Sequence, residues 1–221
     1  LALHALLRKR ITMADPKIEL YRGTQKISEN DNWSPGLASD FARMGAFAFP
    51  NGSRDAAVLG PLAGNTTVVA SGTGPGAILV ECYDSELATP RAERLINLSA
   101  RNHVGPGDDV LIAGFFLAGT GTQRLLIRAV GPTLSTFGVA SPLADPRLVA
   151  FNTLGGRVAE NDDWSAELAP EFARVGAFPL PAGSRDAAII AIIQAGRAYT
   201  VQVSGPGTTT GEALVEIYEL P

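Results

Sequence analysis

The strongest constraint on the fold is an internal repeat that covers most of the 221 residues. Residues 29–57 align without a gap with residues 160–188, and 20 of these 29 positions are identical. The similarity continues on both sides, where "MADPKIELY" (13–21) matches "LADPRLVAF" (143–151) and "ILVECYD" (78–84) matches "ALVEIYE" (213–219). We call the repeated stretch the A repeat. Self-similarity over this length predicts a unit that folds twice.

The two copies of the A repeat span roughly residues 14–84 and 144–220, and a different sequence lies between them. This B segment contains three β-like apolar runs, and the turn sequences "GPGDD" and "GTGTQ" separate them. The predicted organisation is a tail of a preceding repeat or a strand donor at 1–13, a first β-sandwich repeat at 14–91, the B segment at 92–132, and a connector with the second repeat at 133–221. The sequence leaves open which A repeat the B segment completes, because it is covalently adjacent to both.

Short apolar runs bounded by glycine and proline predict an all-β fold, and the chain contains 24 Gly and 15 Pro. The strand candidates of the first A repeat are Lys17–Tyr21, Lys26–Ser28, Ala56–Leu59, Thr67–Ala70 and Ile78–Tyr83, and the B segment adds 94–100, 110–117 and 124–130. Each A repeat also predicts one short helix, at 34–45 and at 165–176, with a serine N-cap and a glycine stop. We therefore expect two tandem β-sandwich repeats of jelly-roll or Ig-like type, each with a helix across one end.

The acidic phrase "ENDNWS" (29–34) returns as "ENDDWS" (160–165), and it has a structural interpretation. Short polar side chains just before a helix accept hydrogen bonds from backbone N–H groups, and a tryptophan at the same place in both copies is typical of a core anchor. The arginine and the aspartate of "GSRDAA", Arg54 and Asp55 in the first repeat, are expected to pair with the acidic phrase or with Glu81. This predicted corner comprises Asn30, Trp33 and Arg54, and their equivalents Asn161, Trp164 and Arg185.

Two binding interpretations of the same phrase compete with the structural one. Calcium takes six to eight oxygen ligands, which carboxylates in such loops supply. The calcium candidates are Asp31, Asp55, Asp162 and Asp186, supported by Glu29, Asn32, Glu160 and Asp163. The phrase lacks the D-x-D-x-D-G spacing of a calcium loop, and the tryptophan interrupts it. The tryptophan rings could instead stack on a glycan. Apart from calcium, no cofactor is expected.

Several function classes find no support in the sequence. The net charge is −4 and basic residues do not cluster with aromatic ones, which argues against nucleic acid as a partner. No run of about 18 apolar residues predicts a membrane span. His4 and His103 lie outside the A repeats, so they do not form a shared catalytic or metal site. The glycine-rich turns lack the lysine and helix of a phosphate loop. We therefore expect no enzyme activity.

An ordered set of phrases resembles a tandem repeat module of large secreted or surface-exposed proteins of environmental bacteria. The phrases are "LIAGFFLAGTGTQRLLIRAVGPTL", "LADPRLVAF", "ENDDW", "FARVGAF", "GSRDAA", "YTVQVSG" and "EALVEIYEL", and the resemblance covers nearly the whole chain beyond residue 13. It implies an extracellular or cell-surface β-sandwich repeat used as stalk, adhesin or matrix material, with no catalytic residues. The chain departs from the module by starting inside a repeat and by the basic "LHALLRKR" in place of the usual connector.

These observations predict a non-enzymatic structural or adhesive protein of the cell exterior. No B segment precedes the first A repeat in this sequence, which would leave a sheet edge open, and open edges pair with other strands. We expect self-association or binding to neighbouring repeats, including a self-assembling fibre in which a segment of one molecule completes a sheet of the next. The alternative is a calcium-dependent or glycan-binding adhesion module.

Overall fold

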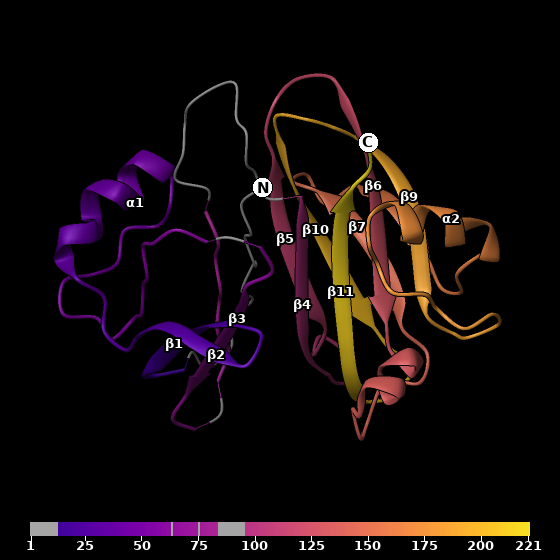
Figure 1. Cartoon of the computed structure of the whole chain (residues 1–221), viewed down its shortest axis with the longest axis horizontal. Coiled ribbons are helices and arrows are strands. Elements are labelled where there is room, and N and C mark those ends of the chain that lie inside the picture. Colours follow the sequence, from indigo (N-terminus) through magenta and orange to yellow (C-terminus); the bar gives the residue numbers. More distant parts are fainter. Residues whose placement is uncertain (1–12, 63, 75, 84–95) are drawn as a thin grey trace. The chain divides into compact units, whose positions relative to one another are not determined.

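The computed structural model describes residues 13–62, 64–74, 76–83 and 96–221, so most of the predicted donor segment at 1–13 lies outside the described residues. The chain divides near residue 88 into two compact units, which hold the first and the second A repeat (Figure 1). The described residues form three antiparallel sheets and a few short helices, which confirms the predicted all-β, sandwich-like fold. Among them, no helix has the length and apolar character needed to cross a membrane.

The first unit contains the predicted helix and three of the five predicted strands. Its elements are β1 (Pro16–Arg22), β2 (Gln25–Asn30), the 3-10 turn η1 (Pro35–Leu37), α1 (Ala38–Met44) and β3 (Thr67–Gly72). The Ser34 hydroxyl accepts a hydrogen bond from the Gly36 amide at 3.3 Å, and Gly45 ends the helix with a positive φ of 72°. This N-cap and this stop are the ones expected from the sequence.

The second unit contains the B segment and the second A repeat. The B segment provides β4 (Asn97–Val104), β5 (Leu111–Leu117) and β6 (Thr122–Val130), and the 3-10 turn η2 (Pro132–Phe137) follows it. The A repeat provides β7 (Arg147–Asn152), β8 (Arg157–Asn161), η3 (Ala166–Leu168), α2 (Ala169–Arg174), β9 (Ala187–Gln194), β10 (Arg197–Ser204) and β11 (Gly211–Glu219).

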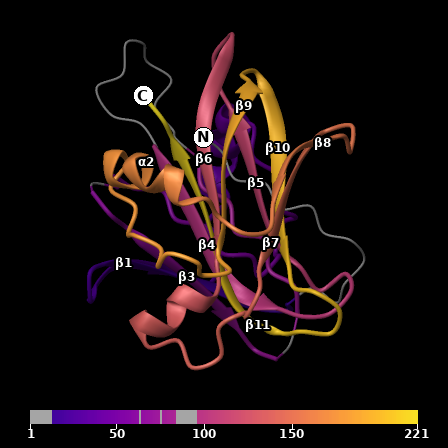
Figure 2. The ribbon, with the colours of Figure 1, turned by 90° about the vertical axis from the view of Figure 1, so that its right-hand side faces the viewer.

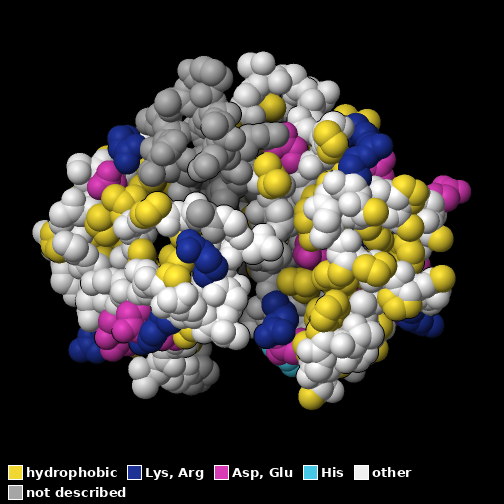
Figure 3. All heavy atoms as spheres, in the orientation of Figure 1, with side chains coloured by type: hydrophobic (Ala, Val, Ile, Leu, Met, Phe, Trp, Pro, Cys, Tyr) yellow, Lys and Arg dark blue, Asp and Glu magenta, His cyan; other side chains and the backbone are white. Residues whose placement is uncertain are grey.

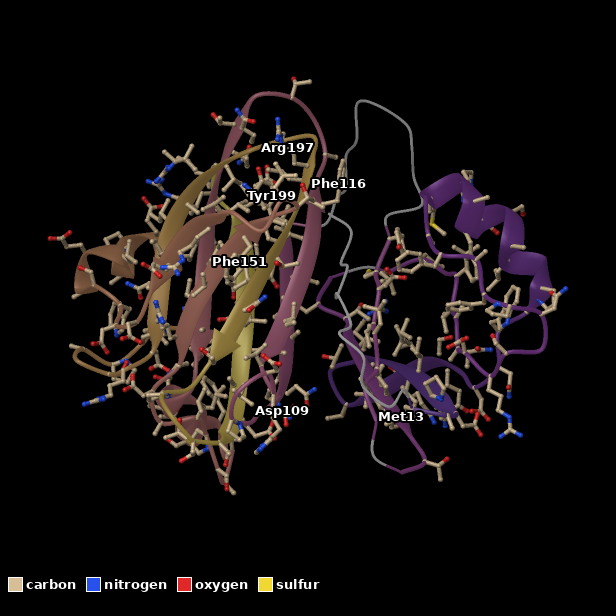
Figure 4. All side chains as sticks on the ribbon, turned by 180° about the vertical axis from the view of Figure 1, so that it is seen from behind. Met13, Asp109, Phe116, Phe151, Arg197 and Tyr199 are labelled. Atoms are coloured by element: carbon tan, nitrogen blue, oxygen red, sulfur yellow. The ribbon has the colours of Figure 1, made fainter. Side chains whose placement is uncertain are left out.

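These strands form a sandwich of two four-stranded sheets, with the orders β5-β10-β7-β8 and β4-β11-β6-β9. The core between the sheets takes alternate residues of each strand, as the two-residue period of β-structure requires. Leu125 and Ile127 of β6, for example, pack in the same cluster as Val215 of β11 and Val201 of β10. Tyr199 of β10 stacks on Phe115 at 5.7 Å between ring centroids and lies at one end of this core (Figure 4).

All three strands of the B segment pair with strands of the second A repeat, which answers the question that the sequence left open. β4 pairs with β11, and β5 pairs with β10. β6 lies between β11 and β9 and forms an antiparallel ladder with each of them. The second repeat therefore reaches its full sandwich only with the B segment inserted into both sheets.

The helix of the second repeat covers a face of a sheet, and the prediction that it lies across an end of the sandwich is wrong. Phe172 of α2 is 1% exposed and packs with Leu126 and Val130 of β6 and with Tyr218 of β11. These strand residues point away from the core between the sheets, because they alternate with the residues that fill it. Figure 2 shows α2 on the outer side of the sheet that contains β6 and β11.

The first unit reproduces three of the four strands of one sheet of this sandwich. Its order β2-β1-β3 corresponds to β8-β7-β10, because each strand aligns with its counterpart in the repeat. The register is also the same: Leu20 pairs with Val68, and the equivalent Ala150 pairs with Val201. One A repeat by itself thus specifies this three-stranded arrangement.

The predicted strands at Ala56–Leu59 and Ile78–Tyr83 are wrong for the first repeat, where neither segment is a strand. Their equivalents in the second repeat are strands, within β9 and β11. The physical reason is the position of β6, since β9 and β11 do not pair with each other but only through β6. Without a strand between them, the two segments lack the ladder that would define them as strands.

Candidate strand-acceptor site

The acidic phrase forms the same backbone corner in both repeats. The Asn30 side-chain oxygen accepts a hydrogen bond from the Ala57 amide at 3.0 Å, and the Asn161 oxygen accepts one from the Ala188 amide at 2.9 Å. In addition, the tryptophan amide that follows donates to the carbonyl of the aspartate in "GSRDAA", at 2.8 Å in the first repeat and 2.9 Å in the second. The phrase thus ties the start of the helix to the "GSRDAA" loop.

The two tryptophan side chains pack inside their repeats. Trp33 is 8% exposed and stacks on Phe41 of α1 at 5.6 Å, and Trp164 lies 5.4 Å from Phe172 of α2. The Trp164 indole N–H also donates to the Ser184 hydroxyl at 3.1 Å. With most of the Trp33 ring covered in this way, it does not present the flat open face on which a sugar would stack.

The arginine of "GSRDAA" does not pair with the acidic phrase or with Glu81, so that part of the prediction is wrong. Arg54 pairs with Asp15 at 3.0 Å, and Arg185 pairs with the equivalent Asp145 at 2.6 Å. Both arginines are largely exposed, which limits each pair to a modest contribution. The pair joins the "GSRDAA" loop to the segment just before the first strand of each repeat.

The glutamate that opens the acidic phrase is neutralised by basic side chains in both copies. Lys17 and Lys26 lie 2.8 and 2.7 Å from Glu29, and these two ammonium groups lower the pKa of Glu29 to about 2. Arg147 and Arg157 lie 3.0 and 2.6 Å from Glu160. A carboxylate with two cationic side chains beside it is a poor calcium ligand, because these side chains compete with the metal ion for its oxygens.

The remaining calcium candidates lie in different environments. Asp31 and Asp162 are exposed, Asp55 is half-buried, and Asp186 is fully buried. Within the described ranges, no group of three or more His, Cys, Asp or Glu residues is arranged to hold a metal ion. Calcium binding stays a prediction.

Asp186 holds the turn that follows β6. One carboxylate oxygen accepts hydrogen bonds from the backbone amides of Gly131 and Thr133, at 2.8 and 3.3 Å. The other oxygen accepts from the Thr133 hydroxyl and from the Ser184 hydroxyl, the latter at 2.7 Å. The carboxylate is 0% exposed, so these four donors replace its solvation by water. Asp186 is thus a receptor for the end of the B segment.

Arg128, in the middle of β6, makes the second such contact, which is not among the residues predicted from the sequence. It is 0% exposed, and its Nε and Nη2 atoms lie 2.9 and 2.7 Å from one oxygen of Glu216. Its Nη1 donates to the Phe178 carbonyl at 2.6 Å. Its guanidinium lies 4.8 Å from the Phe172 ring and 4.3 Å from the Phe178 ring. The sequence signals of this buried ion pair are the arginine inside "LLIRAV" and the glutamate inside "ALVEIYE", because each is a charged residue within an apolar run.

Tyr218 completes this buried charge cluster. Its hydroxyl donates to the second oxygen of Glu216 at 2.7 Å. Burial and the neighbouring Glu216 carboxylate raise the pKa of Tyr218 well above its ordinary value, so the phenol stays protonated and remains a donor. Glu216 therefore has donors at both of its oxygens, which is the condition for burying a carboxylate without a large penalty.

Several contacts within the A repeat are present in both units, among them the asparagine, tryptophan-amide and arginine–aspartate contacts described above, whereas the contacts between A and B are described only in the second. The consequence is visible in the burial of equivalent residues. Val68 is 38% exposed and its equivalent Val201 is 0% exposed; Leu62 is 39% exposed and its equivalent Ile193 is 5% exposed. Apolar side chains of the first unit reach the surface around α1 (Figure 3). The first repeat thus presents residues that a B segment covers in the second.

Comparison with known proteins adds no family to this picture: no protein-family model matches the chain, and no curated protein matches it. Fold and site together define a class, an all-β protein with two A repeats, the second of which contains the strands of a B segment in both of its sheets.

Proposed function

We propose that this is a non-enzymatic structural or adhesive protein of the cell exterior, in which A repeats join to neighbouring repeats or molecules by accepting a B segment as added strands. The observation that carries the proposal is the position of β6 between β9 and β11, together with the absence of strands at the equivalent segments 56–59 and 78–83 among the described residues. Strand addition to an open sheet supplies main-chain hydrogen bonds without specialised chemistry.

The exterior location and the adhesive or structural role rest on the resemblance to surface repeat modules and on the repeated architecture. Assembly rests on the exposed apolar residues of the first unit, which are Phe47, Leu59, Leu62, Val68 and Val69. Apolar side chains beside an unpaired edge favour association with another strand. The same edge would serve for joining to a repeat of the same protein or to a second molecule.

The number of B segments limits how identical copies of the chain can assemble, because each B segment can complete only one A repeat. The described chain has one B segment for two A repeats, and that segment already completes the second repeat. If this B segment paired with the first repeat of another copy, the second repeat of its own chain would lose its B strands. The number of complete sandwiches would therefore stay the same after the exchange. Tethering also favours the repeat that is adjacent in the chain. A donor B segment other than 92–132 is therefore the favoured partner, and a fibre of exchanged copies is the second candidate.

Light scattering behind a sizing column, with negative-stain images, tests the proposal. The full chain is compared with a fusion in which a second copy of residues 92–142 precedes Met13, and with a control fusion in which the added copy has the same composition in scrambled order. We expect the B-fused chain to be monomeric, and its first repeat, followed by Trp33 fluorescence in a Trp164→Phe background, to resist urea better than in the full chain or the scrambled fusion. Polymers of uniform width formed by the full chain and absent from the B-fused chain would indicate the exchanged fibre. A first repeat that is no more stable in the B-fused chain than in the scrambled fusion would refute strand acceptance by the first repeat.

A further inference from the structure

We propose that Asn51 is a site of spontaneous covalent modification, at which the side-chain amide is lost and an aspartate or an isoaspartate takes its place. The reaction is deamidation through a cyclic imide, and water is its only co-reactant. The inference goes beyond the proposed function and does not depend on it. It rests on the turn that contains Asn51 and on the equivalent turn of the second repeat, which has no asparagine.

Asn51 lies in a tight turn at the start of "GSRDAA". The Ser53 amide donates a hydrogen bond to the Pro50 carbonyl at 3.0 Å, and Gly52 has a positive φ of 77°. These features define a four-residue turn with Asn51 and Gly52 as its central residues. Both central residues are exposed, and a Cβ atom placed on Gly52 would meet no other atom within 4 Å. The groups that react are therefore open to water.

The peptide between Asn51 and Gly52 takes no part in the hydrogen bond that closes the turn. Among the described residues, neither the Gly52 amide nor the Asn51 carbonyl has a hydrogen-bond partner. The two common turn types differ in the orientation of this central peptide and in the sign of φ at the third residue, and glycine adopts both signs. Rotation of the peptide therefore carries the Gly52 nitrogen past the Asn51 side chain while the closing hydrogen bond stays in place.

The reaction uses only atoms of these two residues and water. The Gly52 nitrogen attacks the Asn51 Cγ, a new C–N bond closes the imide ring, and the bond between Cγ and the side-chain nitrogen breaks. The Gly52 amide proton leaves with that nitrogen as ammonia. Water then opens the ring at Cγ to give aspartate, or at the main-chain carbonyl carbon to give isoaspartate. Glycine favours the attack because it has no side chain to obstruct the approach of its nitrogen.

The structure distinguishes Asn51 from the other asparagines of the chain. Five of the eight have side chains that are hydrogen bonded, namely Asn30, Asn97, Asn102, Asn152 and Asn161. Asn32 and Asn65 are exposed like Asn51, but a tryptophan and a threonine follow them and crowd the attacking nitrogen. Within the described part of the chain, only Asn51 combines an unbonded side chain with a following glycine.

The second repeat contains the same turn without the reactive residue. The Ser184 amide donates to the Pro181 carbonyl at 3.0 Å, and Gly183 has a φ of 74°. Ala182 occupies the position of Asn51, so the turn forms without an asparagine. The two repeats should therefore differ in their chemical ageing although the backbone of the turn is the same.

The modification changes the charge of the first repeat and, in isoaspartate, its backbone. Either product replaces a neutral amide by a carboxylate, which makes the net charge of −4 more negative by one. Isoaspartate also inserts one extra carbon into the backbone between Pro50 and Ser53, whose hydrogen bond closes the turn. The loop that follows carries the Asp55 carbonyl, which accepts from the Trp33 amide at 2.8 Å. We therefore expect the first repeat to lose stability as isoaspartate accumulates.

Incubation of the full chain in mildly alkaline buffer, followed by tryptic digestion and mass spectrometry, tests the proposal. Trypsin cuts after Arg43 and Arg54, so residues 44–54 form a peptide in which Asn51 is the only asparagine. We expect this peptide to gain about 1 Da with time and to become a substrate for an isoaspartyl methyltransferase. Incubation in water labelled with heavy oxygen should add one labelled atom to it. The peptide of residues 175–185 from the second repeat is the internal control and should stay unchanged.

Two substitutions exchange the turns of the repeats. Asn51→Ala should abolish the modification, and Ala182→Asn should introduce it into residues 175–185. Incubation should also lower the urea midpoint of the first repeat by roughly 0.5 M, as expected for the loss of one hydrogen bond, and should leave that of Asn51→Ala unchanged. Trp33 fluorescence in a Trp164→Phe background reports this midpoint.

A synthetic peptide of residues 44–54 shows how the same sequence reacts outside the fold. A full chain that keeps Asn51 intact while this peptide is modified would refute the proposal, because the folded turn would then protect the residue. An unmodified full chain together with an unmodified peptide would refute it as well. Modification of Asn32 or Asn65 as fast as that of Asn51 would overturn the selectivity inferred from the hydrogen bonds and the following residues.

Discussion

Replacing Arg128 by alanine should remove a large part of the stability of the second repeat. The substitution deletes both contacts to Glu216, at 2.9 and 2.7 Å, and the hydrogen bond to the Phe178 carbonyl at 2.6 Å. It leaves Glu216, which is 5% exposed, as a buried carboxylate whose only remaining described donor is the Tyr218 hydroxyl. Breaking one side of a buried ion pair costs about 3–5 kcal/mol. Because a domain is stable by about 5–15 kcal/mol in total, this loss is a substantial fraction.

Urea unfolding followed by Trp164 fluorescence, in a Trp33→Phe background, measures this effect on the second repeat. With a urea dependence of about 2 kcal/mol per molar, a loss of about 4 kcal/mol lowers the midpoint by about 2 M. The matched control is Arg157→Ala, because Arg157 pairs with Glu160 at 2.6 Å while 54% exposed. An exposed pair contributes about 0–1 kcal/mol.

A second substitution should partly restore the stability that Arg128→Ala removes. Replacing Arg128 and Glu216 together by leucine removes both charges, so no carboxylate is left buried without a cation. We expect this double variant to be at least about 2 kcal/mol more stable than Arg128→Ala, because an apolar pair of similar volume is often as stable as the ion pair. A cost for Arg128→Ala no larger than for Arg157→Ala would refute the account of the buried pair. The same account would be refuted if the double leucine variant were less stable than Arg128→Ala.

Three further predictions concern the carboxylates and the buried phenol. Asp186→Asn should lower the free energy of unfolding in urea by about 2–4 kcal/mol, because it weakens the acceptors for Gly131 and Thr133. Asp162→Asn, at an exposed site, should change it by less than about 0.5 kcal/mol. Equal effects of the two substitutions would contradict this prediction. The raised pKa of Tyr218 means that its stabilisation is fully present below pH 10, the ordinary value, and is lost as pH rises further, so Tyr218→Phe should flatten the alkaline loss of stability measured by urea unfolding. If the acidic phrase binds calcium, calcium should raise the melting temperature and the Asp31→Ala, Asp162→Ala double variant should abolish that rise; equal melting temperatures with and without calcium in the unaltered chain would exclude stabilisation by calcium.

The internal repeat made the fold class and most of the second repeat predictable. Strand positions followed from apolar runs, and the helix ends followed from Ser34, Gly45 and their equivalents, because these signals are local in the chain. The start of β4 was predicted at residue 94, and the structure places the strand at Asn97–Val104. Its register depends on pairing with β11, which is far away in the sequence.

What the sequence did not predict depends on the non-local position of β6. The strands expected at 56–59 and 78–83 carry the right pattern, but a strand also needs a partner. In addition, Gly60 and Pro61 directly follow the first of these segments, at the place where β9 continues in the second repeat. The role of Arg128 was not predictable, because a single basic residue in an apolar run gives no sign of its partner. Glu81 and Glu216 are identical within otherwise apolar segments, but the expected partner of Glu81 lay in "GSRDAA" and not in the B segment.

The interleaved strand order has a consequence for how the second repeat is made. The sheet β4-β11-β6-β9 joins the earliest strand of this unit to its latest, with β11 in a central position. Until β11 is synthesised, β4 has no partner in that sheet and only β6 and β9 can pair. Contacts of such long sequence separation slow folding, because a large loop must close before they form. The second repeat should therefore fold late and slowly, and a nascent chain that stops before residue 211 should remain without half of this sheet.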